Sequence, residues 1–157
     1  KVRKATVFWL GQTDKPKALD ILEKVVHSDR SSEVRKNCVF AISQMDLDRA
    51  TDFLIDLAQK SNDSKIRNTA IFWLGQKASK KAKAALQDIV YSGETTEVQE
   101  KAVFALTQLP DSQGVPHLIR IAKSHPNLKV RKRAIFWLGQ SHDPRALDTL
   151  IELIREK

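Results

Sequence analysis

The chain has 157 residues, of which 41% are hydrophobic and 29% are charged. This composition is typical of a folded domain with a buried core, and it excludes an intrinsically disordered or collagen-like chain. No apolar run approaches the roughly 18 to 20 residues of a membrane span, and a single cysteine, Cys38, excludes an internal disulfide. The 27 Lys and Arg against 19 Asp and Glu give a net charge of +8, which favours acidic partners without identifying one.

A repeat of 32 residues runs through the whole sequence without a gap. Each copy opens with a related stretch, from VRKATVFWLGQ at Val2 to VRKRAIFWLGQ at Val130. The five copies span residues 2–33, 34–65, 66–97, 98–129 and 130–157. Because they fill the chain, we expect one repeat array over residues 1–157 and no second domain.

Two helices are predicted in each repeat. With Val2 as position one, apolar residues recur at positions one, five, eight and nine and again at 17, 21, 24 and 25, the spacing of two amphipathic helices. Favoured N-cap residues precede the first helix at one register: Ser31, Asp63, Thr95 and Asn127. Polar residues also precede the second helix: Asp14, Asp46, Ser79, Asp111 and Asp143. Pro116 lies slightly inside a helix start, where it removes at most one backbone hydrogen bond.

Helix pairs of this kind bury their apolar faces only by stacking on neighbouring pairs. The sequence therefore predicts an all-α fold, a right-handed α-α superhelical solenoid of about ten helices. The last repeat carries a family pattern, in Val130, Arg131, Ala134, Leu138 and Gly139 followed by Asp143, Pro144, Arg145, Ala146 and Leu150. This pattern resembles the short HEAT-like repeat that is also found in phycobilisome lyases, and the resemblance covers the full chain. Such repeats serve unrelated functions, so the resemblance implies the fold and no activity.

Position seven is the feature that points to a function. At 100° per residue it lies almost opposite the predicted buried side, and it is phenylalanine in every repeat: Phe8, Phe40, Phe72, Phe104 and Phe136. Four residues later, on the same side, stand Gln12, Gln44, Gln76, Gln108 and Gln140. In proteins that resemble this one the corresponding helices line the concave side, so we expect a groove with a Phe and Gln ladder. The alternative is that each Phe lies sideways between neighbouring helices and is largely covered, while Gln is solvated.

Basic residues flank the predicted ladder: Lys4, Lys36, Lys101, Lys132 and Arg133. Together with the Phe and Gln ladders they favour a protein or peptide partner, one of acidic character being favoured by the charge. The Arg at position two of four repeats is interpreted instead as a structural residue that reaches carboxylates or helix-end carbonyls of a neighbouring repeat.

Position eight alternates between Trp9, Trp73 and Trp137 in the odd-numbered repeats and Ala41 and Ala105 in the even-numbered ones. We interpret the indoles as core packing, and the true unit as a pair of repeats. Position ten is small in every repeat, which predicts the close approach of another helix. The residues at this position are Gly11, Ser43, Gly75, Thr107 and Gly139.

Nothing in the sequence predicts catalysis or a cofactor. The four histidines fall at four different repeat positions, and none is followed by the glutamate on which the iron site of the similar deoxyhypusine hydroxylases depends. Cys38 lies on the apolar side and is interpreted as a small core residue. We therefore expect a non-enzymatic scaffold without a metal. The alternatives are a nucleic-acid-binding solenoid, whose Lys and Arg would contact phosphates, and a phycobilisome-lyase-like accessory subunit.

The ends of the array give two further expectations. Solenoid ends normally need polar caps, and neither end shows one, so we expect the chain to be a segment of a longer protein or a trimmed product. Uncapped ends also predict end-to-end self-association. We expect no membrane partner.

Overall fold

The computed structural model describes residues 2–155, and its regular structure in that range is entirely helical. The first helix of each repeat is α1 (Val2–Gly11), α3 (Ser32–Gln44), α5 (Ser64–Lys77), α7 (Thr96–Thr107) or α9 (Leu128–Gln140). The second is α2 (Pro16–Ser28), α4 (Asp48–Lys60), α6 (Lys80–Ser92), α8 (Val115–Ser124) or α10 (Pro144–Arg155), with a short 3-10 turn, η1 (Pro110–Ser112), before α8. No helix of residues 2–155 is both long enough and apolar enough to cross a bilayer. The predicted all-α fold of about ten helices is confirmed.

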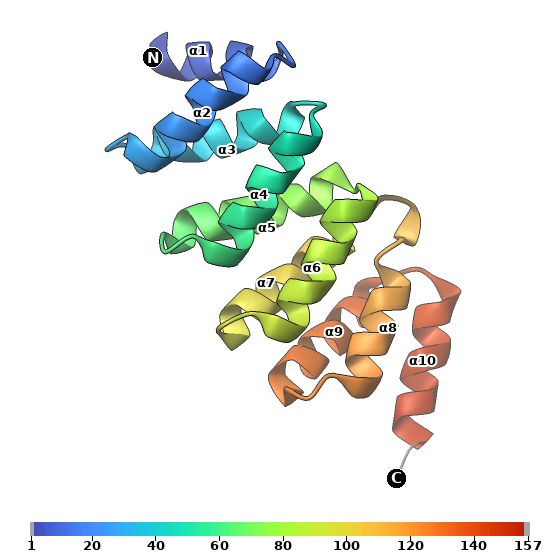
Figure 1. Ribbon diagram of the computed structural model, residues 1–157. Coiled ribbons are helices and arrows are strands. Elements are labelled where there is room, and N and C mark those ends of the chain that lie inside the picture. The colour runs from blue at the N-terminus through green and yellow to red at the C-terminus, as the bar shows by residue number, and fades with distance from the viewer. Residues whose placement is uncertain (1, 156–157) are drawn as a thin grey trace. The chain divides into compact units, whose positions relative to one another are not determined.

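The helices form two compact units that divide inside α6, one ending at Ala82 and the other beginning at Lys83. In the first unit α1, α3 and α5 pack side by side as one row, while α2 packs on α3 and α4 on α5 from a second row (Figure 1). In the second unit α7 packs on α9, and α8 packs on α9 from the other row. This two-row stacking is the predicted solenoid arrangement. The handedness of the superhelix and the single array over residues 1–157 stay predictions.

The predicted N-caps set the helix starts. The side chains of Ser31, Asp63, Thr95 and Asn127 each accept a hydrogen bond from a backbone N–H in the first turn of α3, α5, α7 and α9. The second helices begin near their predicted signals, with α10 directly after Asp143 and α6 directly after Ser79.

The helix α8 begins further after its predicted signal, Asp111, than the other second helices do after theirs. Asp111 and Ser112 adopt left-handed conformations in the turn η1, and the helix begins only at Val115. Gly114 explains the delay, because a Cβ there would lie 1.9 Å from the carbonyl oxygen of Leu106, so the chain must pass close to α7 before it can turn into α8. Pro116 falls in the first turn of α8, where the missing N–H has no intrahelical partner to lose.

Candidate functional site

The buried side of the first helices differs from the predicted one by a single position. Positions one, five, six and nine are buried in the inner repeats, as Val34, Cys38, Val39 and Ile42 of α3 illustrate. Position eight is buried only where it is Ala, so position six completes the apolar stripe instead. The centre of the stripe then lies nearly opposite position seven, and this geometry leaves the Phe residues on the outer side of the row.

The five Phe rings of position seven are neither sealed nor free. Phe8 and Phe136 are 42% and 50% exposed, and Phe40, Phe72 and Phe104 are half-buried. Each ring therefore packs with part of its surface and presents another part to solvent, a state between the two alternatives that the sequence left open. We call the side of the first helices that carries these rings the aromatic face. It comprises Phe8, Trp9, Phe40, Phe72 and Trp73 in the first unit and Phe104, Phe136 and Trp137 in the second.

The Trp residues belong to this face and not to the core. Trp73 contacts Phe40 of the preceding repeat, with ring centroids 4.8 Å apart, and meets Phe72 edge-on at 5.0 Å. Trp137 makes the same two contacts with Phe104 and Phe136 at 5.3 and 5.0 Å. Trp9 has no preceding Phe among the described residues and is 67% exposed. The indoles do pack between adjacent helices, as interpreted, but Trp73 and Trp137 do so at the outer edge of the seam and not in the core.

Two kinds of seam occur between neighbouring first helices within the units. A Cβ at Gly11 would lie 2.7 Å from the oxygen and 2.8 Å from the Cβ of Ala41, so α1 and α3 touch backbone to backbone. At the seam between α7 and α9, Thr107 and Trp137 stand in the corresponding places and line a cavity. Small residues at position ten thus do mark a close helix at Gly11, whereas a Cβ at Gly139 would meet nothing within 4 Å. The alternation of Gly with Ala and of a hydroxyl residue with Trp accounts for the 64-residue period.

The Gln side chains lie beside the rings and are partly tied to them. In α3 the Gln44 amide donates to Ser43 Oγ at 3.1 Å, and Ser43 Oγ donates to the Phe40 carbonyl at 2.6 Å. In the second unit Gln108 repeats this chain through Thr107 Oγ1 to the Phe104 carbonyl, at 3.0 and 2.6 Å. Gln12, Gln44, Gln76 and Gln140 are exposed. Gln44 bonds through its amide nitrogen and is exposed, so its amide oxygen can accept a further hydrogen bond.

The flanking basic residues differ in how far they are neutralised. In the first unit Glu33 pairs with both Lys36 and Lys4, at 3.2 and 3.3 Å, and these two ammonium groups hold the pKa of Glu33 below its usual value. In the second unit Arg133 pairs with Glu100 at 3.5 Å. Lys101 and Lys132 are exposed and make no ion pair among residues 2–155. Uncompensated positive charge on the aromatic face is therefore concentrated in the second unit.

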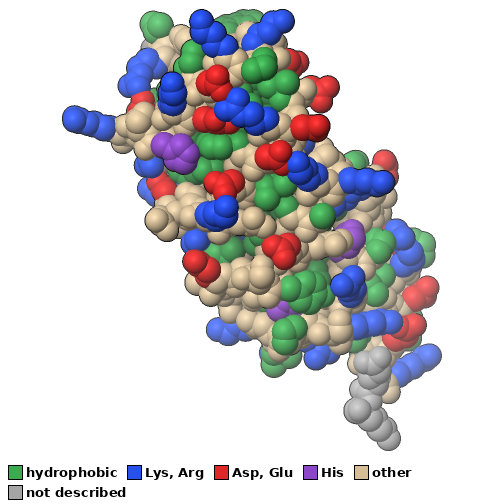
Figure 2. Space-filling view, viewed as in Figure 1, with side chains coloured by type: hydrophobic (Ala, Val, Ile, Leu, Met, Phe, Trp, Pro, Cys, Tyr) green, Lys and Arg blue, Asp and Glu red, His purple; other side chains and the backbone are tan. Residues whose placement is uncertain are grey.

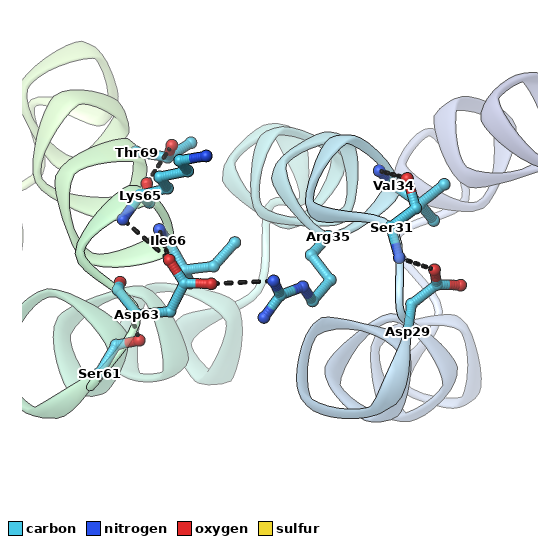
Figure 3. Close-up of polar contacts among 9 residues, drawn as sticks. All are labelled: Asp29, Ser31, Val34, Arg35, Ser61, Asp63, Lys65, Ile66 and Thr69. Atoms are coloured by element: carbon cyan, nitrogen blue, oxygen red, sulfur yellow. Dashed lines mark hydrogen bonds and ion pairs between the residues drawn. The ribbon is translucent and has the colours of Figure 1, made fainter.

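The position-two arginines stabilise the stacking, as interpreted from the sequence. Arg35 of α3 reaches Asp63 at 2.9 Å, and Asp63 also accepts from the amides of Lys65 and Ile66 as the N-cap of α5 (Figure 3). Desolvation alone would raise the pKa of Asp63, but these two amide bonds and Arg35 outweigh it, so its pKa is lowered. Arg131 donates from Nε to the Ala122 carbonyl at the end of α8, at 3.0 Å. Arg35 and Arg131 thus link neighbouring helices and are not available to a partner.

The second helices present a different surface. Over α2 and α4 acidic and basic side chains lie side by side (Figure 2). Arg49 of α4 accounts for part of this, because it pairs with Asp20 and Glu23 of α2 at 2.6 and 2.7 Å. A surface whose charges are paired with one another is typical of a solvated outer layer.

Few of the histidine, cysteine and carboxylate groups in residues 2–155 are placed to bind a metal ion. No cluster of three His, Cys, Asp or Glu side chains that could hold a metal ion occurs in that range. Cys38 is fully buried, and burial raises the pKa of its thiol to about 11. His125 is buried and bonds the Val90 carbonyl through Nε2 at 2.9 Å. Cys38 and His125 are thus held inside the fold.

Sequence reasoning placed the Phe, Gln and Lys residues on one side of the first helices, and within each unit the structure does the same. It missed the three Trp as members of that face. The signal was present in the alternation at position eight, because a bulky residue that follows Phe must lie at the edge of the buried stripe. A single ladder across all five repeats, the concavity of the groove and the partner-binding role of these residues stay predictions.

Comparisons with known proteins agree with this geometry. A family model described as HEAT repeats matches residues 1–75 and 84–157. Among solved structures, the chain is similar to one in the complex of CpcE and CpcF of phycocyanin lyase from Nostoc sp. PCC7120, at 22% identity and a TM-score of 0.53. That match covers 89% of this chain and 99% of the other, and at this identity it shows a shared fold. No curated protein sequence matches the chain.

Proposed function

The chain belongs to the HEAT-repeat family, and from this premise we propose that it is a non-enzymatic scaffold that binds a protein or peptide on the aromatic face. The observation that carries the proposal is the partial exposure of every Phe ring at position seven, with Trp9 and Trp73 in the first unit and Trp137 in the second beside them. Aromatic side chains that present a rigid apolar surface beside polar amides are favoured anchors for a polypeptide.

Charge makes the proposal more specific. Lys101 and Lys132 stand near Phe104 and Phe136 on the same helices without an acidic partner, while Lys4 and Lys36 share Glu33, which offsets one of their two charges. A segment that carries apolar side chains flanked by Asp or Glu complements the second unit best. Lys101, Lys132 and Arg133 then steer the partner, and the rings supply most of the binding free energy.

Selection of peptides from a random displayed library, followed by affinity measurement on single Phe variants, tests the proposal. We expect Phe104→Ala and Phe136→Ala each to weaken the selected peptides at least tenfold, about 1.4 kcal/mol. The matched control is Phe53→Ala, because Phe53 lies on α4 and contacts His27, away from the aromatic face. Equal loss in all three variants, or loss explained by unfolding, would contradict the proposal. A free-energy cost of 3 to 5 kcal/mol for Phe72→Ala would likewise show that the rings act as core.

Salt separates this reading from the nucleic-acid alternative. Binding dominated by phosphate contacts weakens steeply as salt is added, whereas binding anchored by Phe and Trp responds weakly. We expect less than a threefold change in peptide affinity between 50 and 200 mM salt, roughly the effect of screening one or two charges.

A second candidate is an accessory subunit of a chromophore lyase, which the shared fold with CpcE and CpcF favours. That complex consists of two named proteins, so the candidate also implies a protein partner. It differs in predicting that a bilin binds, which a shift in the visible absorption of added phycocyanobilin would reveal. An unchanged absorption spectrum would remove this candidate and leave the scaffold.

A further inference from the structure

A cavity of about 300 Å³ opens in the second unit where α7 and α9 end and α8 begins. Thr107 and Leu109 line it from the end of α7, Ser112 from η1, and Trp137, Gln140 and Ser141 from the end of α9. It therefore borders the aromatic face at Trp137. The apolar walls leave room for an aliphatic chain, and the helix ends bring backbone carbonyls to the site.

The equivalent place in the first unit shows what such a site holds. There the side chain of Lys77, at the end of α5, donates from Nζ to the carbonyl oxygens of Met45 and Ser43 at 2.7 and 3.3 Å. Burial lowers the pKa of Lys77, while Asp46, Asp14 and Asp48 act in the opposite direction. A primary ammonium thus rests against the carbonyl end of α3, where the helix dipole favours a cation.

The repeat makes the two places equivalent residue by residue. Thr107 occupies the position of Ser43, Leu109 that of Met45, and Ser141 that of Lys77. The backbone agrees, with φ and ψ of −72° and 133° at Met45 against −64° and 137° at Leu109. Both residues donate their N–H three positions back, to the carbonyls of Ile42 and Leu106, at 3.2 and 3.3 Å. The carbonyls of Thr107 and Leu109 are therefore presented as those of Ser43 and Met45 are.

The two places differ in the cation, in the acidic neighbours and in the start of the following helix. Ser141 is too short to reach these carbonyls, and its hydroxyl accepts from the Asp143 amide at 3.2 Å. All three acidic neighbours differ, because the residues 64 positions after Asp14, Asp46 and Asp48 are Ala78, Pro110 and Ser112. An ammonium in the second unit is thus held by carbonyls and the dipole of α7 with less help from carboxylates, so we expect a dissociation constant on the order of millimolar for a small amine.

We propose that this cavity binds a primary alkylammonium group, supplied by a lysine side chain of the polypeptide that lies on the aromatic face. The ammonium bonds the carbonyls of Thr107 and Leu109, and the methylene chain packs on Leu109 and Trp137. The identification of the ammonium as part of a polypeptide rests on the proposed function, whereas the cavity's preference for an ammonium does not.

The probe is n-propylammonium, which equals the part of a lysine side chain beyond Cβ, and the readout is the indole N–H resonance of Trp137 in the full chain. Trp137→Phe assigns that resonance. We expect a saturable shift with propylammonium, and at most a tenth of it with n-propanol at the same concentration. Ser141→Lys, verified as folded by circular dichroism, should weaken the probe at least tenfold. A shift of equal size with n-propanol, no saturable shift, or full binding by folded Ser141→Lys overturns the proposal.

Lys77→Ala gives a second readout that does not depend on Ser141→Lys. Its loss of thermal stability should be partly restored by propylammonium and not by n-propanol, because the amine replaces the deleted group against Met45 and Ser43. Equal restoration by both compounds would show that the carbonyls of Ser43 and Met45 do not select a cation.

The lysine source is tested with the selected peptides. Replacing their Lys by norleucine should weaken binding to the wild type at least fivefold and leave binding to Ser141→Lys unchanged; no effect on the wild type overturns the lysine assignment. If no peptide binds at all, the proposed function fails, and the propylammonium titration still decides the preference of the cavity.

Discussion

Gly11 and Gly139 occupy the same repeat position near the end of a first helix, yet their surroundings are opposite. A Cβ at Gly11 would lie 2.7 Å from the Ala41 oxygen and 2.9 Å from the Ala41 Cα, whereas ordinary contacts begin near 3.4 Å. A Cβ at Gly139 would meet nothing within 4 Å. Substitution of each by Ala therefore adds the same methyl group to a close backbone contact in one case and to open space in the other.

The expected free energies follow from two opposing effects. Ala stabilises a helical position relative to Gly by roughly 0.5 to 1 kcal/mol, somewhat less in a last turn. Forcing a methyl group against backbone costs about 1 to 3 kcal/mol, because backbone cannot rotate away as a flexible side chain does. We expect Gly139→Ala to raise the free energy of unfolding by up to about 1 kcal/mol and Gly11→Ala to lower it by about 1 to 2 kcal/mol.

Urea denaturation followed by circular dichroism measures both variants, and hydrogen exchange at the amides of α1 locates the effect of Gly11→Ala. Local exchange is needed because repeat arrays open from their ends, so a terminal helix can loosen without a change in the global transition. If both variants change stability in the same direction and by the same amount, the close approach of α1 to α3 is refuted.

Three further outcomes are expected. Asp63→Ala removes the N-cap of α5 and the partner of Arg35, and it should lower the free energy of unfolding by about 1 to 2 kcal/mol at pH 7, with Ser64→Ala as control. Because the pKa of Asp63 is lowered, its contribution is present above the pKa of the unfolded chain, near 4, and is lost as the pH falls through the lower folded value. A variant that loses stability in acid as steeply as the wild type would contradict this role. Trp73→Ala should cost about 2 to 3 kcal/mol and Trp9→Ala less than about 1 kcal/mol in urea denaturation, since only Trp73 is packed between two Phe rings; equal costs would argue against the seam. Cys38, with its pKa raised to about 11, should react with a thiol reagent at pH 8 at least a hundredfold more slowly than in urea, and fast labelling of the native chain would show that the core around α3 is open.

The sequence predicts the regular part of this fold because the repeat multiplies weak signals. One Ser before an apolar residue says little, but Ser31, Asp63, Thr95 and Asn127 at one register predict four helix starts, and all four are N-caps. The late start of α8 could not be predicted in this way. It depends on the close contact between Gly114 and the Leu106 carbonyl, and helical periodicity does not describe contacts between a loop and a helix.

The candidate site divides along the same line. Outward placement of Phe40 follows from 100° per residue, whereas its half-burial depends on Trp73 of the next repeat, a tertiary contact that no helical pattern contains. The cavity beside Trp137 is harder to predict from the sequence. It exists because residue 141 is too short to fill it, whereas Lys77 fills the equivalent place in the earlier repeat.

The two kinds of seam have a consequence for how such an array changes its length. Gly11 at the end of α1 packs against Ala41 of α3, whereas Thr107 at the end of α7 lies beside Trp137 of α9. Each first helix therefore fits a neighbour with a small residue or one with a large residue at position eight, but not both. Gain or loss of a single 32-residue copy would place Trp against Gly, where there is no room for the indole, or Ala against Ser or Thr, where a cavity would remain. Duplication therefore preserves the packing between helices only when two copies are added together, which makes the pair of repeats the evolutionary unit of this fold.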